Sequence, residues 1–355
     1  MNPQNQIENK RILSLDVLRG IAVAGMILVN HCKGETFTPL KHSDWNGMTP
    51  CDLVFPFFLY IMGISTYLSL RKYQFKWSAI VARKITKRTI LIFLLGLGIN
   101  WLGNGFEGNW GWSDLRIMAV LQRIALCYCV VSLLALFVNH KYSLHIAFGL
   151  LAIYSVILLT GDGYVLVVTN IIARVDYAVL GESPIDPEGV LSTISAIAHT
   201  LIGFWCGRTM VLSENTNEKV MNFLLAGAVL VFCGYLLSYG LPLNKCIWSP
   251  SYVLMTCGLA SLLQGILMYT INIQHHRKWT MLFLVFGVNP LFLYVLSETM
   301  SMVFWKIGVE DLLYDSIHAI VTNECWASLC FALTNVLICG IIGWWLYKRK
   351  IFIKI

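Results

Sequence analysis

Charged residues are scarce in this chain: Asp, Glu, Lys and Arg make up 13% of its 355 residues, whereas ordinary soluble domains contain about 25%. Hydrophobic residues make up 57%, and the mean hydropathy is +0.68. A water-facing surface cannot be built from this composition, which excludes a soluble enzyme. Long apolar runs recur to the end of the sequence, so a soluble domain with a single membrane anchor is excluded as well.

The apolar runs lack the alternation of polar and apolar residues that is typical of barrel strands. A helix crosses the hydrocarbon core with about 20 apolar residues, and only helices or closed barrels satisfy their backbone there. We therefore predict an all-α, polytopic membrane bundle that forms one domain over residues 1–355. About ten spans are expected, near residues 13–31, 51–70, 84–102, 117–138, 142–160, 192–211, 219–238, 250–272, 279–298 and 326–346.

Basic residues are unevenly placed, although the net charge of +7 alone could suggest a nucleic-acid partner. If the N-terminus is cytoplasmic, eighteen lysines and arginines fall on that side of the predicted membrane and six on the other. This asymmetry follows the positive-inside rule. We therefore expect both termini in the cytoplasm, no nucleic-acid partner, and His42 on the outer side, in the loop between the first two spans.

Two further motifs are missing. The first apolar run has no small-residue cleavage site, which predicts a retained span and not a signal peptide. The eleven cysteines form no C-x-x-C pair and the histidines show no metal-ligand spacing, so we expect no metal. Cys32, Cys51, Cys246 and Cys325 are predicted at the outer face, where an oxidising compartment could pair some of them, and the sequence leaves this open.

Ionisable side chains inside the predicted spans need a partner or a purpose, because each costs at least ~2.5–3.5 kcal/mol to insert. Asp16 and Arg19 lie three residues apart on one helical face, where they can pair with each other or bind a charged ligand. Arg123, in the fourth span, can be a structural anchor or a ligand contact. Asn289 and Pro290 interrupt the ninth span, and such breaks are tolerated where helices line a cavity.

The segment LKHSDWNGMTPCDLVFPFF, residues 40–58, places a histidine and two carboxylates just before a long apolar run. Thr49 and Asp52 match a helix capping box, which explains Asp52 as a structural residue and not a catalytic one. His42 has no comparable structural explanation, and a histidine can take up and return a proton near neutral pH. Asp44 could orient the imidazole or simply be solvated.

Two blocks in this region, RILSLDVLRGIAVAGMILVN and KHSDWNGMTPCDLVFPFFLYIMG, resemble the signature of the heparan-α-glucosaminide N-acetyltransferase family and its bacterial relatives. The later segments LQR, DPEGVLSTI, LNKCIWSPSYVL and GVNPLFLY follow in the order that this family shows. The resemblance covers nearly the whole chain. Members of the family are transmembrane acyltransferases that use cytoplasmic acetyl-CoA to acetylate the amine of a terminal glucosamine across the membrane.

The resemblance implies a site on the outer side. The family's catalytic histidine lies in the motif H-x-x-W-N-G, which begins here at His42, and its partner asparagine matches Asn30. His42 would act as general base or carry the acetyl group itself, and Asn30 could donate to the developing oxyanion. Trp45 could stack on a sugar or anchor the chain at the interface. Candidates for binding the sugar or CoA are Asp16, Arg19, Trp45, Asn46, Arg123 and Asn289.

The sequence departs from the family pattern at two places. Twelve residues precede the first span, whereas the lysosomal relatives carry a large luminal segment there, which favours a bacterial inner-membrane version. The family often has glycines after the asparagine, but this chain has His31, Cys32 and Lys33 before Gly34, so we expect a different acceptor pocket.

Two other functions remain open from the sequence. A transporter or channel would use the kinked spans as a solute path, with His42 as a gating or proton-coupling residue. An O-acyltransferase of a surface polysaccharide would share the topology and prefer a hydroxyl acceptor. The expected partners of the acetyltransferase are acetyl-CoA, an amino sugar and the lipid bilayer, and the sequence leaves a homodimer open.

Overall fold

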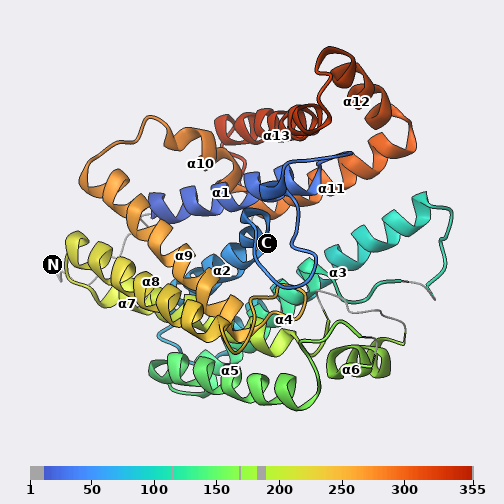
Figure 1. Ribbon diagram of the computed structural model, residues 1–355. Coiled ribbons are helices and arrows are strands. Elements are labelled where there is room, and N and C mark those ends of the chain that lie inside the picture. The colour runs from blue at the N-terminus through green and yellow to red at the C-terminus, as the bar shows by residue number, and fades with distance from the viewer. Residues whose placement is uncertain (1–11, 113–114, 168, 182–188, 354–355) are drawn as a thin grey trace.

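The computed structural model describes residues 12–112, 115–167, 169–181 and 189–353 (Figure 1). This described part of the chain consists of helices and connecting loops, without a strand. The α-helices are α1 Leu13–Asn30, α2 Val54–Arg71, α3 Ala79–Phe106, α4 Val120–Phe137, α5 Ser143–Thr160, α6 Ile171–Leu180, α7 Thr193–Leu212, α8 Thr216–Ser238, α9 Pro250–Met268, α10 Thr280–Val288, α11 Pro290–Lys306, α12 Val309–Ile320 and α13 Glu324–Lys348. A 3₁₀ turn, Pro50–Leu53, precedes α2, and a π-helical turn, Tyr269–Ile273, extends α9.

The helices agree with the predicted spans in type and order. Eight of the described helical stretches are long and apolar enough to cross a membrane, or nine if α10 and α11, bent by 83° at their junction, form one broken span. The all-α, multi-span architecture is therefore confirmed. The count of ten spans and the cytoplasmic position of both termini stay predictions, and the terminal charges Lys10, Arg11 and Lys354 lie outside the described residues.

Helix α7 occupies a predicted span but is not among the eight, because polar residues interrupt its sequence. Those polar side chains face protein: Ser195, His199 and Thr200 are fully buried. The helix packs against α2, α4, α5 and α9 and so needs little apolar surface toward lipid. Central helices such as α2 and α9 are 67% buried over their most apolar stretch, whereas peripheral α3 is only 17% buried.

Two pairs of helices approach each other at backbone distance. A Cβ added to Gly20 on α1 would lie 1.9 Å from the Phe283 carbonyl oxygen on α10, and one added to Gly287 would lie 1.9 Å from the Asp16 carbonyl oxygen. Gly63 on α2 likewise faces α7 without room for a side chain. Small residues at crossings permit this close packing in membranes.

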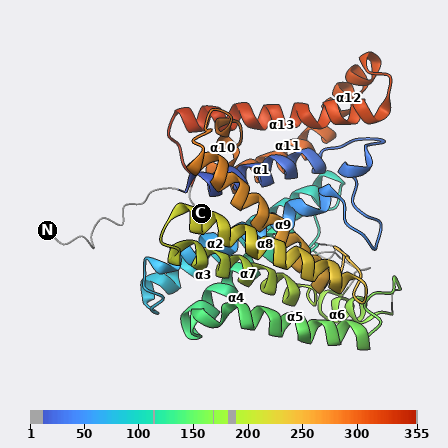
Figure 2. The ribbon, with the colours of Figure 1, turned by 60° about the vertical axis from the view of Figure 1, so that its left-hand side comes forward.

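The predicted interruption at Asn289 and Pro290 is confirmed. Proline cannot donate a helical hydrogen bond, so α10 ends at Val288 and α11 starts in a new direction at Pro290. Figure 2 shows α11 lying beside α1, with α13 outside them. The break therefore directs the start of α11 into the bundle, next to the first two turns of α1.

Candidate active site

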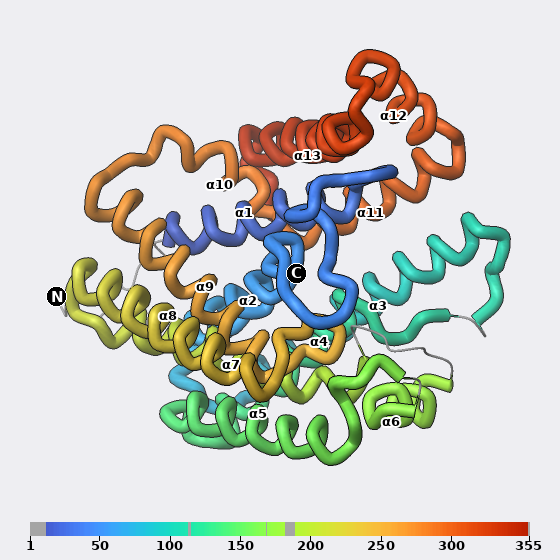
Figure 3. Tube along the Cα trace, in the orientation of Figure 1, coloured from blue at the N-terminus to red at the C-terminus, as the bar shows by residue number. Residues whose placement is uncertain are grey.

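The loop between α1 and α2 is hydrogen-bonded to two loops from distant parts of the chain, the loop after α5 and the loop before α9, and Figure 3 shows the path of the chain there. Trp45 Nε1 donates a hydrogen bond to the Tyr164 carbonyl at 2.8 Å. The Asn46 side-chain oxygen accepts one from Asn244 Nδ2 at 3.2 Å. Two predicted sugar- or CoA-binding residues thus have partners within the protein, and their contact with a substrate stays a prediction.

The loop that precedes α9 is rigid where it meets the loop after α1. The Gly47 amide donates to the Leu243 carbonyl at 2.7 Å, and Gly47 has a φ of +124°, which favours glycine. The Asn244 side chain accepts a hydrogen bond from the Ile247 amide at 3.1 Å, and Trp248 is fully buried. Residues carried by either loop are therefore held in a fixed relation.

Asp52 joins the loop to the start of α2. One carboxylate oxygen, Oδ2, accepts hydrogen bonds from the amides of Thr49 at 3.0 Å and Ser43 at 3.2 Å. The other oxygen, Oδ1, lies 2.6 Å from Nδ1 of His42. The predicted capping box is present, but the interpretation of Asp52 as structural only was incomplete, because its second oxygen holds the imidazole.

The Asp52–His42 contact also assigns the imidazole tautomer. A carboxylate can only accept, so the short contact places the ring proton on Nδ1 of His42. In the neutral ring, the lone pair is then on Nε2. Because the His42 side chain is 53% exposed while Asp52 is completely buried, a ligand at these loops can reach the imidazole.

The backbone of Asp52 is anchored separately. Pro56 has no N–H, so the Asp52 carbonyl four residues earlier receives no helical hydrogen bond. The hydroxyl of Tyr252, on α9, donates to that carbonyl at 2.5 Å. This bond connects the start of α2 to the start of α9, and thus to the loop that precedes α9.

Lys245 and Cys51 complete a group that we call the His42 cluster: His42, Cys51, Asp52 and Lys245. Lys245 Nζ lies 3.0 Å from Nδ1 and 3.3 Å from Nε2 of His42, and 3.5 Å from Asp52 Oδ1. Cys51 Sγ lies 3.1 Å from Nδ1. The histidine, cysteine and aspartate atoms lie within 4.8 Å of one another, as metal ligands could, but the ammonium beside them would repel a cation.

Asp44, the other loop carboxylate, is exposed and makes no hydrogen bond with His42 in the described structure. The role of orienting the imidazole therefore falls to Asp52. Sequence reasoning missed both Asp52 and Lys245 as site residues. The signal for Lys245 was its position, because it is one of only six basic residues predicted on the outer side.

Asn30 is the last residue of α1 and is exposed. Its Nδ2 donates to Oε1 of Glu298, on α11, at 2.9 Å, and no hydrogen bond joins it to His42 in the described structure. Next to it, the two ring nitrogens of His31 face the carbonyls of Ile27 and Ser297. The structure thus fixes Asn30 between α1 and α11, and its predicted catalytic role stays untested.

A second polar site, which we call the arginine cavity, lies among α1, α2, α3, α4 and the break between α10 and α11. Its volume is about 260 Å³, and its lining includes Arg19, Phe58, Ser65, Arg88, Pro290 and Ile353. The predicted Asp16–Arg19 pair is confirmed at 2.8 Å. Arg19 also donates to Ser65 Oγ at 3.0 Å and to the Gly287 carbonyl at 3.2 Å, so its guanidinium is fixed at the cavity wall.

Arg88 supplies the second cation of the arginine cavity. Its guanidinium carbon lies 4.6 Å from the centre of the Tyr128 ring, and its Nε has no hydrogen-bond partner among the described residues. Arg88 makes no ion pair with the described carboxylates. A guanidinium group that lies over an aromatic ring and has no described carboxylate partner is suited to bind an anionic ligand.

The C-terminal segment covers part of this cavity. Asn289 Nδ2 donates to the Ile351 carbonyl at 3.0 Å, and its Oδ1 accepts from the Ile353 amide at 2.9 Å. Ile353 also lines the arginine cavity. Both polar atoms of Asn289, a predicted CoA contact, therefore bond to the backbone of the C-terminal segment. Asn289 could bind acetyl-CoA only after this segment moves.

Arg123 is completely buried. Its guanidinium donates to the Gly189 carbonyl at 3.0 Å and to the Ser192 hydroxyl, and lies 5.1 Å from the Trp248 ring centre. These contacts support the anchor that the sequence offered for this residue. Contact with a ligand would require the loop before α7 to open.

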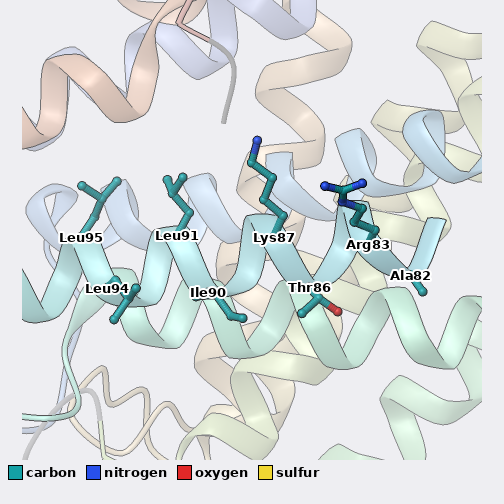
Figure 4. A pocket seen from close by; sticks show the side chains of 8 residues that line it. All are labelled: Ala82, Arg83, Thr86, Lys87, Ile90, Leu91, Leu94 and Leu95. Atoms are coloured by element: carbon teal, nitrogen blue, oxygen red, sulfur yellow. The ribbon is translucent and has the colours of Figure 1, made fainter. Parts of the chain in front are cut away.

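A third hollow follows the outer face of α3 and has a volume of about 700 Å³. Figure 4 shows Arg83 and Lys87 pointing to the same side as Leu91 and Leu95 along this helix. All of its lining comes from α3. The hollow is thus a face of one peripheral helix, in contrast to the cavity that several helices enclose around Arg19.

The cysteines at this end of the bundle are not cross-linked to one another. Cys32, Cys51, Cys246 and Cys325 form no disulfide in the described structure. The loops there are held by the hydrogen bonds described above and by the ion pair of Lys33 with Asp311 on α12.

These features define an integral, all-helical membrane protein with a histidine–aspartate pair in loops at one end. A family model described as heparan-alpha-glucosaminide N-acetyltransferase, catalytic, matches residues 11–180, which include His42, Asp52, Arg19 and Arg88. The mouse protein named heparan-alpha-glucosaminide N-acetyltransferase is 27% identical over 97% of this chain, and the human protein of the same name is 26% identical over the same share.

These matches confirm the resemblance predicted from the sequence: the chain is similar to heparan-alpha-glucosaminide N-acetyltransferases over nearly its whole length. The chain spans about 60% of the length of each of these two relatives. Lys245 and Asn289 lie beyond the residues that the family model matches.

Proposed function

We propose that this protein is a transmembrane acetyltransferase, which moves the acetyl group of cytoplasmic acetyl-CoA to the amine of a glucosamine-type sugar on the outer side. The observation that carries this proposal is the exposed imidazole of His42, oriented by the buried carboxylate of Asp52 at 2.6 Å. Likeness to the N-acetyltransferases over 97% of the chain supports the reaction class.

The arginine cavity is the proposed site for the phosphate groups of the donor. Arg19 and Arg88 offer two guanidinium groups, which bind phosphate with paired hydrogen bonds. The positive end of the α11 dipole at Pro290 adds to this field. A dianionic phosphate would supply the counter-charge that Arg88 lacks among the described residues.

The direction of the cavity also supports a donor that reaches toward His42. Along α2 its lining runs from Ser65, beside the arginines, to Phe58. Phe58 lies six residues after Asp52, roughly 9 Å along a helix axis. The thin, uncharged pantetheine arm would follow this direction, and the Phe58 side chain would have to move to let the thioester reach the His42 cluster.

At the outer end, the unprotonated sugar amine would attack the thioester carbonyl carbon. The new C–N bond forms, the C–S bond breaks, and Nε2 of His42 takes the proton that the nitrogen loses. The imidazolium is stabilised by Asp52 and then returns the proton to the CoA sulfur. The products are the N-acetyl sugar and CoA, with no net change in the protein.

A second route uses the same atoms. Nε2 of His42 would first attack the thioester carbon, the C–S bond would break, and the CoA thiolate would leave and take up the proton that Nδ1 gives up. The sugar amine would then attack the N-acetylimidazole, break its N–C bond and return one amine proton to the imidazole. The two routes differ in one observable. Incubation with labelled acetyl-CoA without acceptor would leave label on the His42 peptide only if the imidazole carries the group.

The test is to incubate purified protein with labelled acetyl-CoA and glucosamine, beside its His42→Ala variant. We expect labelled N-acetylglucosamine from the wild type and a rate about 10²–10⁴-fold lower from the variant, the usual contribution of a general base. Asp44→Asn is the control for a change in the same loop. Binding of CoA with label only on hydroxyl sugars would favour an O-acyltransferase, and no CoA binding at all would overturn the proposal.

A further inference from the structure

The placement of Lys245 is not explained by membrane topology. It lies in the loop before α9, on the side where basic residues are few, and its side chain is only 14% exposed. The loop is fixed by the bonds from Gly47 to Leu243 and from Asn244 to Asn46, and by the Trp248 amide, which donates to the Lys245 carbonyl at 3.0 Å. The backbone that carries the lysine is therefore held next to the loop of His42 by several hydrogen bonds.

The charges around His42 oppose one another. Asp52 Oδ1 at 2.6 Å stabilises a protonated imidazole, whereas the Lys245 ammonium at 3.0 and 3.3 Å from the two ring nitrogens repels one. The other titratable group in contact is the Cys51 thiol. On the histidine's own loop, Lys41 and Asp44 are exposed and make no hydrogen bond to the ring in the described structure.

We propose that Lys245 keeps His42 in its neutral, proton-accepting form, so that Asp52 can orient the imidazole without protonating it. This inference rests on the proposed function for its role in catalysis, but not for its test. Without the lysine, the carboxylate of Asp52 would be left to favour the imidazolium over the neutral ring. With it, Nδ1–H stays bonded to Asp52 and Nε2 keeps its lone pair.

The same repulsion would act during turnover. When the amine proton reaches Nε2, the imidazolium stands beside the Lys245 ammonium, and the two like charges favour passing the proton on to the leaving CoA sulfur. Lys245 thus acts through His42, as a positioning residue. An arginine at this place would keep the charge, whereas a methionine would keep only the approximate length.

The first test follows the protonation of His42 without turnover. Diethyl pyrocarbonate acylates unprotonated imidazole, so the extent of His42 modification against pH, measured on its peptide by mass spectrometry, gives a titration midpoint. In Lys245→Met we expect this midpoint to rise by about 1–3 pH units, as a charge at this distance typically shifts a titration. Lys245→Arg should stay near the wild type, and exposed His276 serves as the internal control.

The second test follows activity. If acetyl transfer is found, the acid limb of the kcat/KM profile should move up by the same amount in Lys245→Met and not in Lys245→Arg. An unchanged His42 midpoint in Lys245→Met, or a Lys245→Arg variant that behaves like Lys245→Met, would overturn the inference. A shifted midpoint in a protein without acetyl transfer would leave the inference standing and reject the proposed function instead.

Discussion

In the His42 cluster every charged side chain lies within hydrogen-bonding distance of another, whereas in the arginine cavity Arg88 makes no ion pair with a described carboxylate and lies over the Tyr128 ring. The first arrangement pairs its charges without a ligand, because Asp52 and Lys245 lie close to each other and to Nδ1 of the same histidine. Among the described residues, the second has one carboxylate for its two arginines, Asp16, which pairs with Arg19. This difference is what the two proposed roles would require: proton transfer at the His42 cluster and binding of an anion at the arginine cavity.

The largest expected effect comes from uncoupling the histidine from its carboxylate. Asp52→Asn keeps the side-chain volume, but its one oxygen is needed by the Thr49 and Ser43 amides, so its NH2 group would face Nδ1 of His42 and favour the wrong imidazole tautomer. We therefore expect kcat to fall about 10²–10⁴-fold, as when a general base is lost. Asp44→Asn makes the same chemical change in the same loop and should leave kcat unchanged. Equal activities of the two variants would contradict the role given to Asp52.

The arginine cavity is addressed by Arg88→Gln. Loss of one charged hydrogen bond to phosphate is worth about 1.5–3 kcal/mol, which corresponds to a rise of roughly 10–100-fold in the KM for acetyl-CoA with little change in kcat. Arg83→Gln, at an exposed position of the same helix outside the arginine cavity, is the matched control. A fall in kcat with a constant KM would show that Arg88 acts in the chemical step and not in donor binding. It would also contradict the different roles given to the His42 cluster and the arginine cavity.

A smaller effect is expected for Asn289→Ala. The variant loses both hydrogen bonds to Ile351 and Ile353, which should lower the free energy of unfolding by roughly 1–3 kcal/mol, visible as a lower Tm. The KM for acetyl-CoA should change by less than in Arg88→Gln, because the side-chain amide of Asn289 bonds to the protein backbone and not to the cavity. A larger rise in KM would show that Asn289 contacts the donor.

The smallest effect is expected for Lys33→Met, outside both sites. Burial opposes the charge of Lys33, but the hydrogen bond to Asp311 and the nearby Glu310 outweigh it and raise its pKa above 10.5. The ion pair therefore stabilises the fold fully below pH 10.5 and loses its effect as the pH rises through the higher folded-state value. We expect a loss of at most ~1 kcal/mol at neutral pH, reduced by salt, and unchanged activity. A larger stability loss that salt does not reduce would contradict a surface pair.

The sequence predicted those features that depend on neighbours along the chain. Apolar runs predicted helices, the spacing of Asp16 and Arg19 predicted their pair, and Asn289–Pro290 predicted the break. The capping box at Thr49 and Asp52 was also correctly predicted. In each case the interaction is local, so helix periodicity or the missing N–H of proline is enough to foresee it.

The features that sequence reasoning missed depend on contacts between distant segments. Lys245 meets His42 across 203 positions, and Asn30 meets Glu298 across 268. No local pattern contains such pairings. Asp52 was missed for another reason: its capping role was taken as a full explanation, although a carboxylate has a second oxygen free to bind elsewhere.

The contact between Gly20 and Gly287 limits how this protein can move. With backbone against backbone, α1 and α10 share a fixed pivot, and the Arg19 guanidinium bonded to the Gly287 carbonyl is locked at that point. A swing of one half of the bundle against the other, as in alternating-access transport, would have to separate these two helices. For a substrate to pass Arg19, the C-terminal segment at residues 351–353 would therefore have to move away from the cavity, while α1 and α10 keep their positions.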